Sequence, residues 1–155
     1  MKLIKKKKIT KIKIIIDYQV KSFKDLFSWC QCIESINFKN FCRNNITNMN
    51  GLFSWSLLLK ELSLTNFNTD NVTDMGNMFY ECSSLKELNL NNFNTNNVTN
   101  MRSMFSRCSL LKELNLTNFN TNNVYNMWSM FLGCSDDLKM KIKSENKNIR
   151  AEAFN

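Results

Sequence analysis

Residues 85–110 read LKELNLNNFNTNNVTNMRSMFSRCSL, and residues 111–136 read LKELNLTNFNTNNVYNMWSMFLGCSD. The two segments share 20 of 26 positions. A third copy occupies residues 59–84, and a diverged copy at 33–58 keeps the apolar positions. A fixed period of this length is typical of proteins built from stacked structural units. The period therefore decides how every other residue is interpreted.

Each unit combines two apolar periodicities, followed here in residues 59–84. Leu62 and Leu64 alternate with polar residues, as in a short half-buried strand. A second apolar set follows at the spacing of one helical face: Val72, Met75, Phe79 and Cys82. Asn71 precedes this set, where it would cap the first helical turn, and Asp74 would lie near the positive end of the helix dipole. We therefore predict an α/β solenoid with one short parallel strand and one short helix per 26-residue repeat, whose stacked apolar columns form the core.

The period divides the chain into three parts. Residues 1–32 form a basic arm and a degenerate amino-terminal capping repeat, and residues 137–155 form a carboxy-terminal cap and tail. The repeats fill residues 33–136 as four units: 33–58, 59–84, 85–110 and 111–136. The tail begins at Leu138, one position out of register, and we predict that it adds a strand over the last unit.

The composition fits one globular domain. The chain has 155 residues, of which 43% are hydrophobic, and this is enough for one core. It contains no Pro and three Gly. We therefore expect its turns to be formed by Asn, which tolerates left-handed backbone and bonds to its own neighbours.

The first 24 residues hold the whole formal charge of +8. They contain nine Lys and one acidic residue, Asp17, so the rest of the chain is formally neutral. Ile12, Ile14 and Ile16 alternate with lysines, which predicts a strand that covers the first unit and turns its Lys side chains outward. Binding of nucleic acid or anionic membrane through residues 1–24 is the weaker alternative.

The sequence predicts neither a membrane span nor a signal peptide. No run approaches the roughly 18 consecutive apolar residues that a membrane helix needs. The basic start resembles that of a signal peptide, but its apolar run is interrupted by Lys11 and Lys13 and ends at Asp17 without a small-residue cleavage site. The sequence by itself therefore leaves the compartment open, with a cytoplasmic protein as one alternative.

Three thiols recur at the period of the repeat: Cys82, Cys108 and Cys134. Cys30 lies in the same column, and Ser56 replaces Cys once. One thiol per layer on the buried face behaves as a small apolar residue, and a row diverges too far for the four convergent ligands of zinc. We predict core cysteines, with a disulfide or zinc as alternatives. A disulfide would be sought among Cys30, Cys32 and Cys42.

The sequence offers little for catalysis. It contains no His, which removes His-based acid/base chemistry and most metal sites. Glu61, Glu87 and Glu113 form a column beside Lys of the same units, and we interpret this column as a solvated charge ladder. We expect no enzyme, no metal site and no cofactor.

The strand motif LKELNLxNF of residues 85–93 and 111–119 resembles the leucine-rich-repeat consensus L-x-x-L-x-L. The longer phrase NFNTxNVxxMxxMFxxC resembles the 26-residue repeat of BspA-like bacterial surface proteins, a variant also found in mycoplasma lipoproteins. The resemblance covers residues 33–136. It implies a right-handed leucine-rich-repeat solenoid, placement at the cell surface, adhesion to other cells and no catalysis.

The concave strand face is the predicted binding surface, because its polar side chains point away from the buried leucines. Its residues are Glu61, Ser63, Thr65, Glu87, Asn89, Asn91, Glu113, Asn115 and Thr117. We predict a monomeric, non-catalytic module that binds a protein or a cell surface; an intracellular structural or self-assembling repeat protein is the alternative.

Aromatic residues also occur at columns outside the core: Trp29, Trp55, Tyr80, Tyr125 and Trp128. Aromatic side chains are enriched in interfaces. They also serve to cover the ends of a stack, and the sequence leaves both interpretations open.

Overall fold

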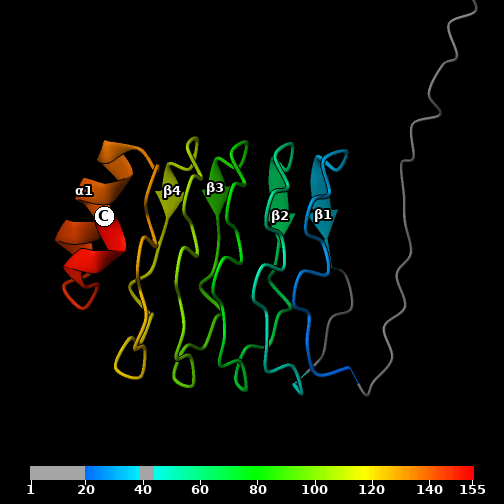
Figure 1. Ribbon diagram of the computed structural model, residues 1–155, viewed down its shortest axis with the longest axis horizontal. Coiled ribbons are helices and arrows are strands. Elements are labelled where there is room, and N and C mark those ends of the chain that lie inside the picture. Colours follow the sequence, from blue (N-terminus) through cyan, green and yellow to red (C-terminus); the bar gives the residue numbers. More distant parts are fainter. Residues whose placement is uncertain (1–19, 39–43) are drawn as a thin grey trace, which may run out of the picture.

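The computed structural model describes residues 20–38 and 44–155 of the chain. Each 26-residue unit forms one elongated loop, and successive loops lie side by side in a row (Figure 1). The strands are β1 (Ser35–Asn37), β2 (Glu61–Ser63), β3 (Glu87–Leu88) and β4 (Glu113–Leu114). Pairing is parallel, of β1 with β2 and of β3 with β4. The described part is thus a mixed α/β protein with short parallel strand pairs and few helices.

Equivalent residues of successive units are neighbours in space. In the strands, Ile36 pairs with Leu62, and Leu88 pairs with Leu114. A second row of parallel bridges joins the units on their other side: Ser22, Asn48, Asp74, Asn100 and Asn126. All of these partners are 26 positions apart, so the period of the sequence is the register of the structure.

The helix predicted for each unit is absent from the described residues. Residues 74–82 and their equivalents (22–30, 48–56, 100–108 and 126–134) instead form successive tight turns, here named the turn segments. The Met75 and Phe79 amides donate to carbonyls of the next unit, at 3.0 and 2.9 Å, rather than to their own segment. Asn77 and Glu81 have φ angles of 54° and 61°, which end any right-handed helix. Turns of this length keep the same apolar spacing as a helix, and the helix prediction was wrong for that reason.

The predicted Asn caps are wrong as well, because there is no helix for them to cap. The side-chain amides of Asn71 and Asn97 each donate to a backbone carbonyl of the preceding unit, at 2.6 Å. Asp74 accepts from the Gly76 amide at 2.8 Å and from the side chain of Asn100 at 3.0 Å. These polar side chains therefore join neighbouring units and turns, as Asn-rich stretches can when the chain returns to the same position every 26 residues.

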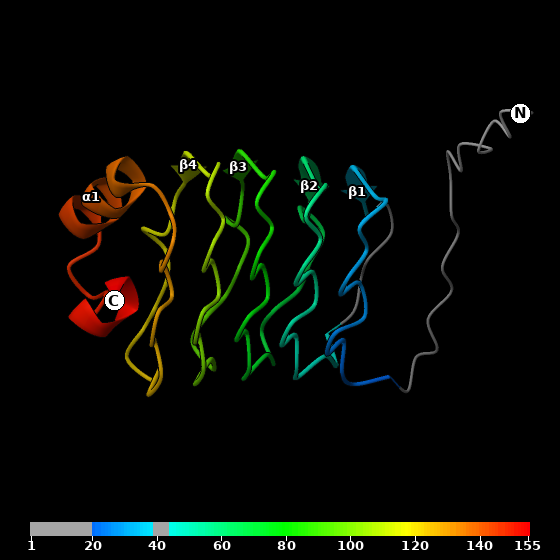
Figure 2. The same ribbon diagram turned by 45° about the horizontal axis from the view of Figure 1, so that its top comes forward.

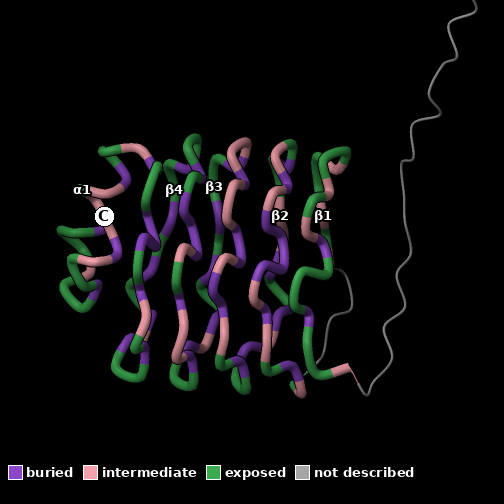
Figure 3. Tube along the Cα trace, in the orientation of Figure 1, coloured by how far each residue is buried: buried purple, intermediate pink, exposed green. Residues whose placement is uncertain are grey.

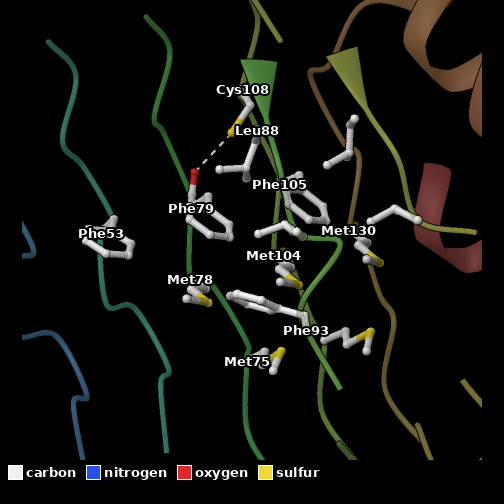
Figure 4. Close-up of a cluster of buried hydrophobic side chains, with 14 of the residues drawn as sticks. Phe53, Met75, Met78, Phe79, Leu88, Phe93, Met104, Phe105, Cys108 and Met130 are labelled. Atoms are coloured by element: carbon white, nitrogen blue, oxygen red, sulfur yellow. Dashed lines mark hydrogen bonds between the residues drawn. The ribbon is translucent and has the colours of Figure 1, made fainter. Parts of the chain in front are cut away.

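The core consists of apolar columns that run along the row of units. Buried residues follow the inner side of every loop (Figure 3). Phe53, Phe79, Phe105 and Phe131 stack in one column, with ring centroids 5.6 to 5.7 Å apart. The adjoining columns contain buried Leu and Met (Figure 4). Each such side chain contributes about 1.5–3 kcal/mol of burial free energy, so the columns hold the units together.

The thiols at the repeat period lie in the core, as predicted. Cys82, Cys108 and Cys134 are buried, and each donates its thiol to a carbonyl 29 positions earlier at 3.0 to 3.1 Å. Figure 4 shows the bond from Cys108 to the Phe79 carbonyl. Ser56 makes the same bond through its hydroxyl, at 3.0 Å. The alternative of a disulfide is not realised between Cys30 and Cys32, which are both free, and Cys42 lies outside the described residues.

The carboxy-terminal strand prediction is also wrong. The tail forms the helix α1 (Asp136–Glu145), followed by the 3-10 helix η1 (Ala151–Phe154), at one end of the row (Figure 2). Ser135 caps α1 by accepting from the Leu138 amide at 3.3 Å. Leu138 and Ile142 are four positions apart and both buried, which is the spacing of a helix rather than of a strand.

The end of the tail packs on the last unit with the same kind of contacts that join successive units, although it is not itself a repeat unit. The Phe131 amide donates to the Ala153 carbonyl at 2.7 Å, and the Phe154 ring stacks on Phe131 at 5.3 Å. The predicted strand around Ile12–Ile16 lies outside the described residues. Neither helix of the described part has the length and apolar character needed to cross a membrane.

Candidate functional site

The predicted strand face is on the surface, on and just after β2, β3 and β4. Ser63 is half-buried, and the other predicted residues are exposed: Glu61, Thr65, Glu87, Asn89, Asn91, Glu113, Asn115 and Thr117. The register places Glu87 directly beside Glu113, so two carboxylates are adjacent. Lys141 of α1 lies 3.1 Å from the Glu113 carboxylate. Part of this acidic column is therefore neutralised by the chain itself.

Two Asn residues of the strand face stabilise local turns. The side-chain oxygen of Asn89 accepts from the Asn91 amide at 3.0 Å, and that of Asn115 accepts from the Thr117 amide at 2.9 Å. Their carboxamide oxygens are thus already bonded. The strand face has exposed polar groups but fewer free acceptors than the sequence predicts.

A hollow of about 590 Å³ lies over three turn segments at the amino-terminal end of the row. We name it the aromatic hollow. Three rings and three longer polar side chains line it: Trp29, Trp55, Tyr80, Asp25, Asn50 and Asn77. They come from three successive units, so the hollow exists only because the units are in register.

The rings of the aromatic hollow form a row. The Trp29 and Trp55 indoles stack with their centroids 4.7 Å apart and their planes 9° apart. Tyr80 meets Trp55 edge to face at 5.4 Å. Trp29 nonetheless remains 59% exposed. Because Trp55 covers one face of the Trp29 indole, this exposure places the other face toward solvent.

Both tryptophans hold a backbone conformation that large residues rarely adopt. Their φ angles are 61° for Trp29 and 60° for Trp55. The left-handed region costs a residue other than Gly about 1–2 kcal/mol. The ladder between units holds them there, since the Trp29 amide donates to the Ser54 carbonyl at 2.8 Å and the Trp55 amide to the Tyr80 carbonyl at 2.7 Å. The conformation is therefore imposed by the stacking of the units, and the two tryptophans adopt it in spite of their size.

The column of the two tryptophans changes chemistry along the row. The next units place Glu81 and Arg107 there, joined by an ion pair of 2.9 Å, and the last unit places Gly133. The backbone is left-handed at all five positions. The fold therefore accepts Gly or charged residues in this column, and the core does not require Trp.

The polar groups of the aromatic hollow differ in how they are engaged. The Asn50 side chain donates to Asp74 at 3.1 Å, and the hydroxyls of Ser28 and Ser54 bond to each other at 2.8 Å. Asp25 lies against the backbone of Gly51, where a β-carbon would collide with its carboxylate. Within residues 20–38 and 44–155, the Asp25 carboxylate makes no hydrogen bond or ion pair, and neither does the Asn77 side chain. Both are free to bond a ligand.

The sequence indicated these aromatic residues as candidates but did not predict the hollow that they line. Trp29 and Trp55 are 26 positions apart, which placed them in one column from the start. Two features of the hollow have no sequence signature. One is the left-handed backbone of the two tryptophans, and the other is the approach of Asp25 to Gly51. The other flagged aromatics, Tyr125 and Trp128, are 73% and 56% exposed and lie outside this lining.

Burial governs the pKa values of the thiols that recur at the repeat period. Burial raises the pKa of the Cys82 thiol to about 12 and that of Cys134 to about 11. It also holds the pKa of Cys108 well above its ordinary value, with a further rise from the neighbouring thiols. In this part of the chain, no group of three or more His, Cys, Asp or Glu could hold a metal ion.

Comparison with known proteins relates most of the chain to one family. A family model described as "Mycoplasma protein of unknown function, DUF285" matches residues 21–144. A search of the curated proteins found no match, and neither did a search of the solved structures.

Proposed function

Since the chain belongs to this DUF285 family of Mycoplasma proteins, we propose from its own surfaces that it is a non-catalytic module that binds a protein or a cell surface. The binding site is the aromatic hollow. The observation that carries the proposal is the stacked pair Trp29 and Trp55, in which Trp29 is exposed and Trp55 is half-buried, although each residue is in the strained left-handed region. The backbone is left-handed in this column of every unit and carries Gly in one of them, so the fold does not require Trp there.

The finer description of the fold is part of the proposal. The row of units would be a solenoid of the leucine-rich-repeat type, in the variant of the BspA-like surface proteins. The strand motif LKEL supports it, as does the register of 26 from Ser22 to Asn126. Adhesion and placement at the cell surface are expectations that come from the same resemblance.

The chemistry of the chain supports a role without catalysis. The sequence has no His, so the commonest acid/base side chain is missing. Its three thiols at the repeat period have raised pKa values and donate to backbone carbonyls, so at neutral pH they are protonated and bonded. Protonated buried thiols are poor nucleophiles.

The strand face is the second candidate surface. It is favoured by the exposed column of Glu61 and Glu87, neither of which forms an ion pair within the described residues. It is disfavoured by the local bonds of Asn89 and Asn115 and by the pairing of Glu113 with Lys141.

Adsorption to cultured animal cells, measured by flow cytometry of the epitope-tagged chain, distinguishes the two surfaces. The variant W29G/W55G removes the rings, and E61A/E87A changes the strand face by the same number of residues. We expect W29G/W55G to weaken adsorption at least tenfold and E61A/E87A to leave it within twofold. The reverse result would move the site to the strand face, and equal adsorption by all three chains would contradict both sites.

A further inference from the structure

We infer that the ligand of the aromatic hollow is a carbohydrate: a short, uncharged sugar chain. This inference rests on the proposed function, which places the binding site at the hollow. It is drawn from the flat solvent-facing ring of Trp29 and from Asp25 and Asn77, polar residues of the same lining that have no side-chain partner in the described residues.

The exposed face of Trp29 suits a sugar ring. A pyranose has one face of C–H groups, and this face packs against a flat aromatic ring while the hydroxyls point outward. Trp55 stacks on the other side of the Trp29 indole and fixes its plane. An aromatic ring that is already oriented loses little conformational entropy when the ligand binds.

The polar groups of the hollow suit the hydroxyls of the same sugar. The carboxylate of Asp25 accepts hydrogen bonds at two oxygens, and the carboxamide of Asn77 both donates and accepts. Both groups line the hollow and are free of partners in the described residues. Hydroxyl groups can satisfy a mixture of donors and acceptors of this kind.

Other ligand classes fit the lining less well. An anionic ligand would find no Lys or Arg in the lining and would be repelled by Asp25. A purely apolar ligand would bury Asp25 and Asn77 without partners, which is costly for polar groups. A cation would gain from Asp25, but a cation–π cage uses several ring faces. Here Trp29 and Trp55 cover one face of each other.

The size of the hollow agrees with a short oligosaccharide. Its volume of about 590 Å³ is within the range of about 300–1,000 Å³ typical of small-ligand sites. The hollow spans three units, and adjacent units lie about 4.8 Å apart where their strands pair. A short sugar chain can thus place one ring on the free face of Trp29, which points away from Trp55, and a neighbouring ring over Asp25 at the edge of the hollow.

Saturation-transfer NMR of the whole chain tests the inference. The probes are cellotetraose, chitotetraose and maltotetraose at millimolar concentration, with tetramethylammonium as a cationic probe. We expect saturation transfer to at least one tetrasaccharide and none to tetramethylammonium. W29G should abolish it, and D25N should weaken binding about fivefold or more.

Trp128 supplies the matched control, because it is 56% exposed, against 59% for Trp29, but lies outside the hollow. W128A should bind the sugar as the parent chain does. The inference is overturned if none of the three tetrasaccharides binds, if binding survives W29G, or if tetramethylammonium binds in their place. If cell adsorption depends on Trp29 and Trp55 but no sugar binds, only the ligand class is wrong. If adsorption does not depend on them, the proposed function itself fails.

Discussion

The indole of Trp29 stacks on that of Trp55 at 4.7 Å, and both residues hold left-handed backbone with φ near 60°. Two residues 26 positions apart thus combine a favourable ring contact with an unfavourable backbone conformation. The ring contact contributes about 0.5–1.5 kcal/mol, and each left-handed residue costs about 1–2 kcal/mol. Together the two left-handed residues cost about 2–4 kcal/mol, which is more than the ring contact contributes, so the pair adds nothing to stability and its function lies elsewhere.

The first prediction follows from this balance. Replacing both residues in W29G/W55G removes the ring contact but also relieves the backbone strain, and Gly133 occupies the same column naturally at φ 74°. We expect the free energy of unfolding to change by less than about 1.5 kcal/mol, because the relief of about 2–4 kcal/mol of strain is offset by the lost ring contact and by about 0.5–1 kcal/mol of unfolded-state flexibility for each Gly. Urea unfolding followed by circular dichroism measures it.

The control for this substitution is W128G. Trp128 is not among the residues with left-handed backbone, so Gly there relieves no strain. It should destabilise the chain by about 0.5–1 kcal/mol through the flexibility that Gly adds to the unfolded state. If the free energy of unfolding of W29G/W55G fell by more than about 3 kcal/mol, the two tryptophans would have to be part of the structural framework.

The second prediction concerns thiol reactivity. Cys82, Cys108 and Cys134 are buried and have raised pKa values, whereas Cys32 is exposed. Because thiolates are the reacting species, we expect iodoacetamide at pH 8 to label Cys32 in the native chain within minutes and to leave the three buried thiols unlabelled for hours. Peptide mass spectrometry identifies the labelled sites, and the chain unfolded in urea is the control. Rapid labelling of Cys108 in the native chain would show that the core column is open to solvent.

The third prediction is a loss of stability at alkaline pH. The folded pKa values of Cys82 and Cys134 are about 12 and about 11, and an unfolded thiol has a pKa of about 8.5. Below pH 8.5 the thiols are protonated in both states, so their contribution is complete. Above it only the unfolded chain loses protons, so stability falls as the pH rises toward the folded pKa values. Each buried thiol adds a slope of about 1.4 kcal/mol per pH unit between about pH 9 and 11.

Urea unfolding at pH 8, 9 and 10 measures that slope, and C108S is the matched variant. Ser56 already occupies the same column and makes the equivalent bond to a carbonyl, so Ser can replace the hydrogen bond of Cys108 but does not titrate. We expect the slope between pH 9 and 10 to be smaller in C108S by about 1.4 kcal/mol per pH unit. Equal slopes in the two chains would mean that the Cys108 thiol ionises in the folded state as it does in the unfolded one.

The fourth prediction concerns the Asn side chains between units. The side-chain amide of Asn97 donates to the backbone carbonyl of Asp70 at 2.6 Å. N97D would place a carboxylate oxygen against that carbonyl and should destabilise the chain by about 1–3 kcal/mol. N122D is the control, because Asp70 already occupies the equivalent position, and it should change stability by less than about 0.5 kcal/mol. Thermal unfolding of the two variants should therefore differ, and equal midpoints would rule out a role for this side-chain ladder.

The sequence predicted what the 26-residue period controls. Leu62 and Leu88, like their equivalents, are in short parallel strands, and the Phe79 and Cys82 columns are buried. Aligning the sequence with itself at a shift of 26 positions is enough to infer these columns, because a repeated residue contacts its own equivalents when units stack.

The predictions from the sequence were wrong where two backbone conformations give the same spacing of apolar residues. Met75 and Phe79 fit one face of a helix, but a chain of turns bonded to the next unit places them on one side equally well. Leu138 and Ile142 were assigned to a strand, although Ser135 and their spacing of four indicate the helix α1. Amphipathic spacing alone does not tell whether the backbone amides bond within the segment or to a neighbouring unit.

The candidate site was predictable only in part. The positions of Trp29 and Trp55 in one column outside the core were visible in the sequence, and both side chains line the aromatic hollow. The outward turn of these rings depends on left-handed φ angles at residues that seldom adopt them. The contribution of Asp25 depends on the missing side chain of Gly51. Neither feature follows from residue type or spacing.

The central claim is that Trp29 and Trp55 are retained for binding, and the adsorption isotherm of W29G/W55G on cultured cells tests it most directly. The account predicts adsorption at least tenfold weaker than that of the parent chain, together with a free energy of unfolding within about 1.5 kcal/mol of the parent value. Adsorption equal to that of the parent, by a variant that is folded, would contradict it.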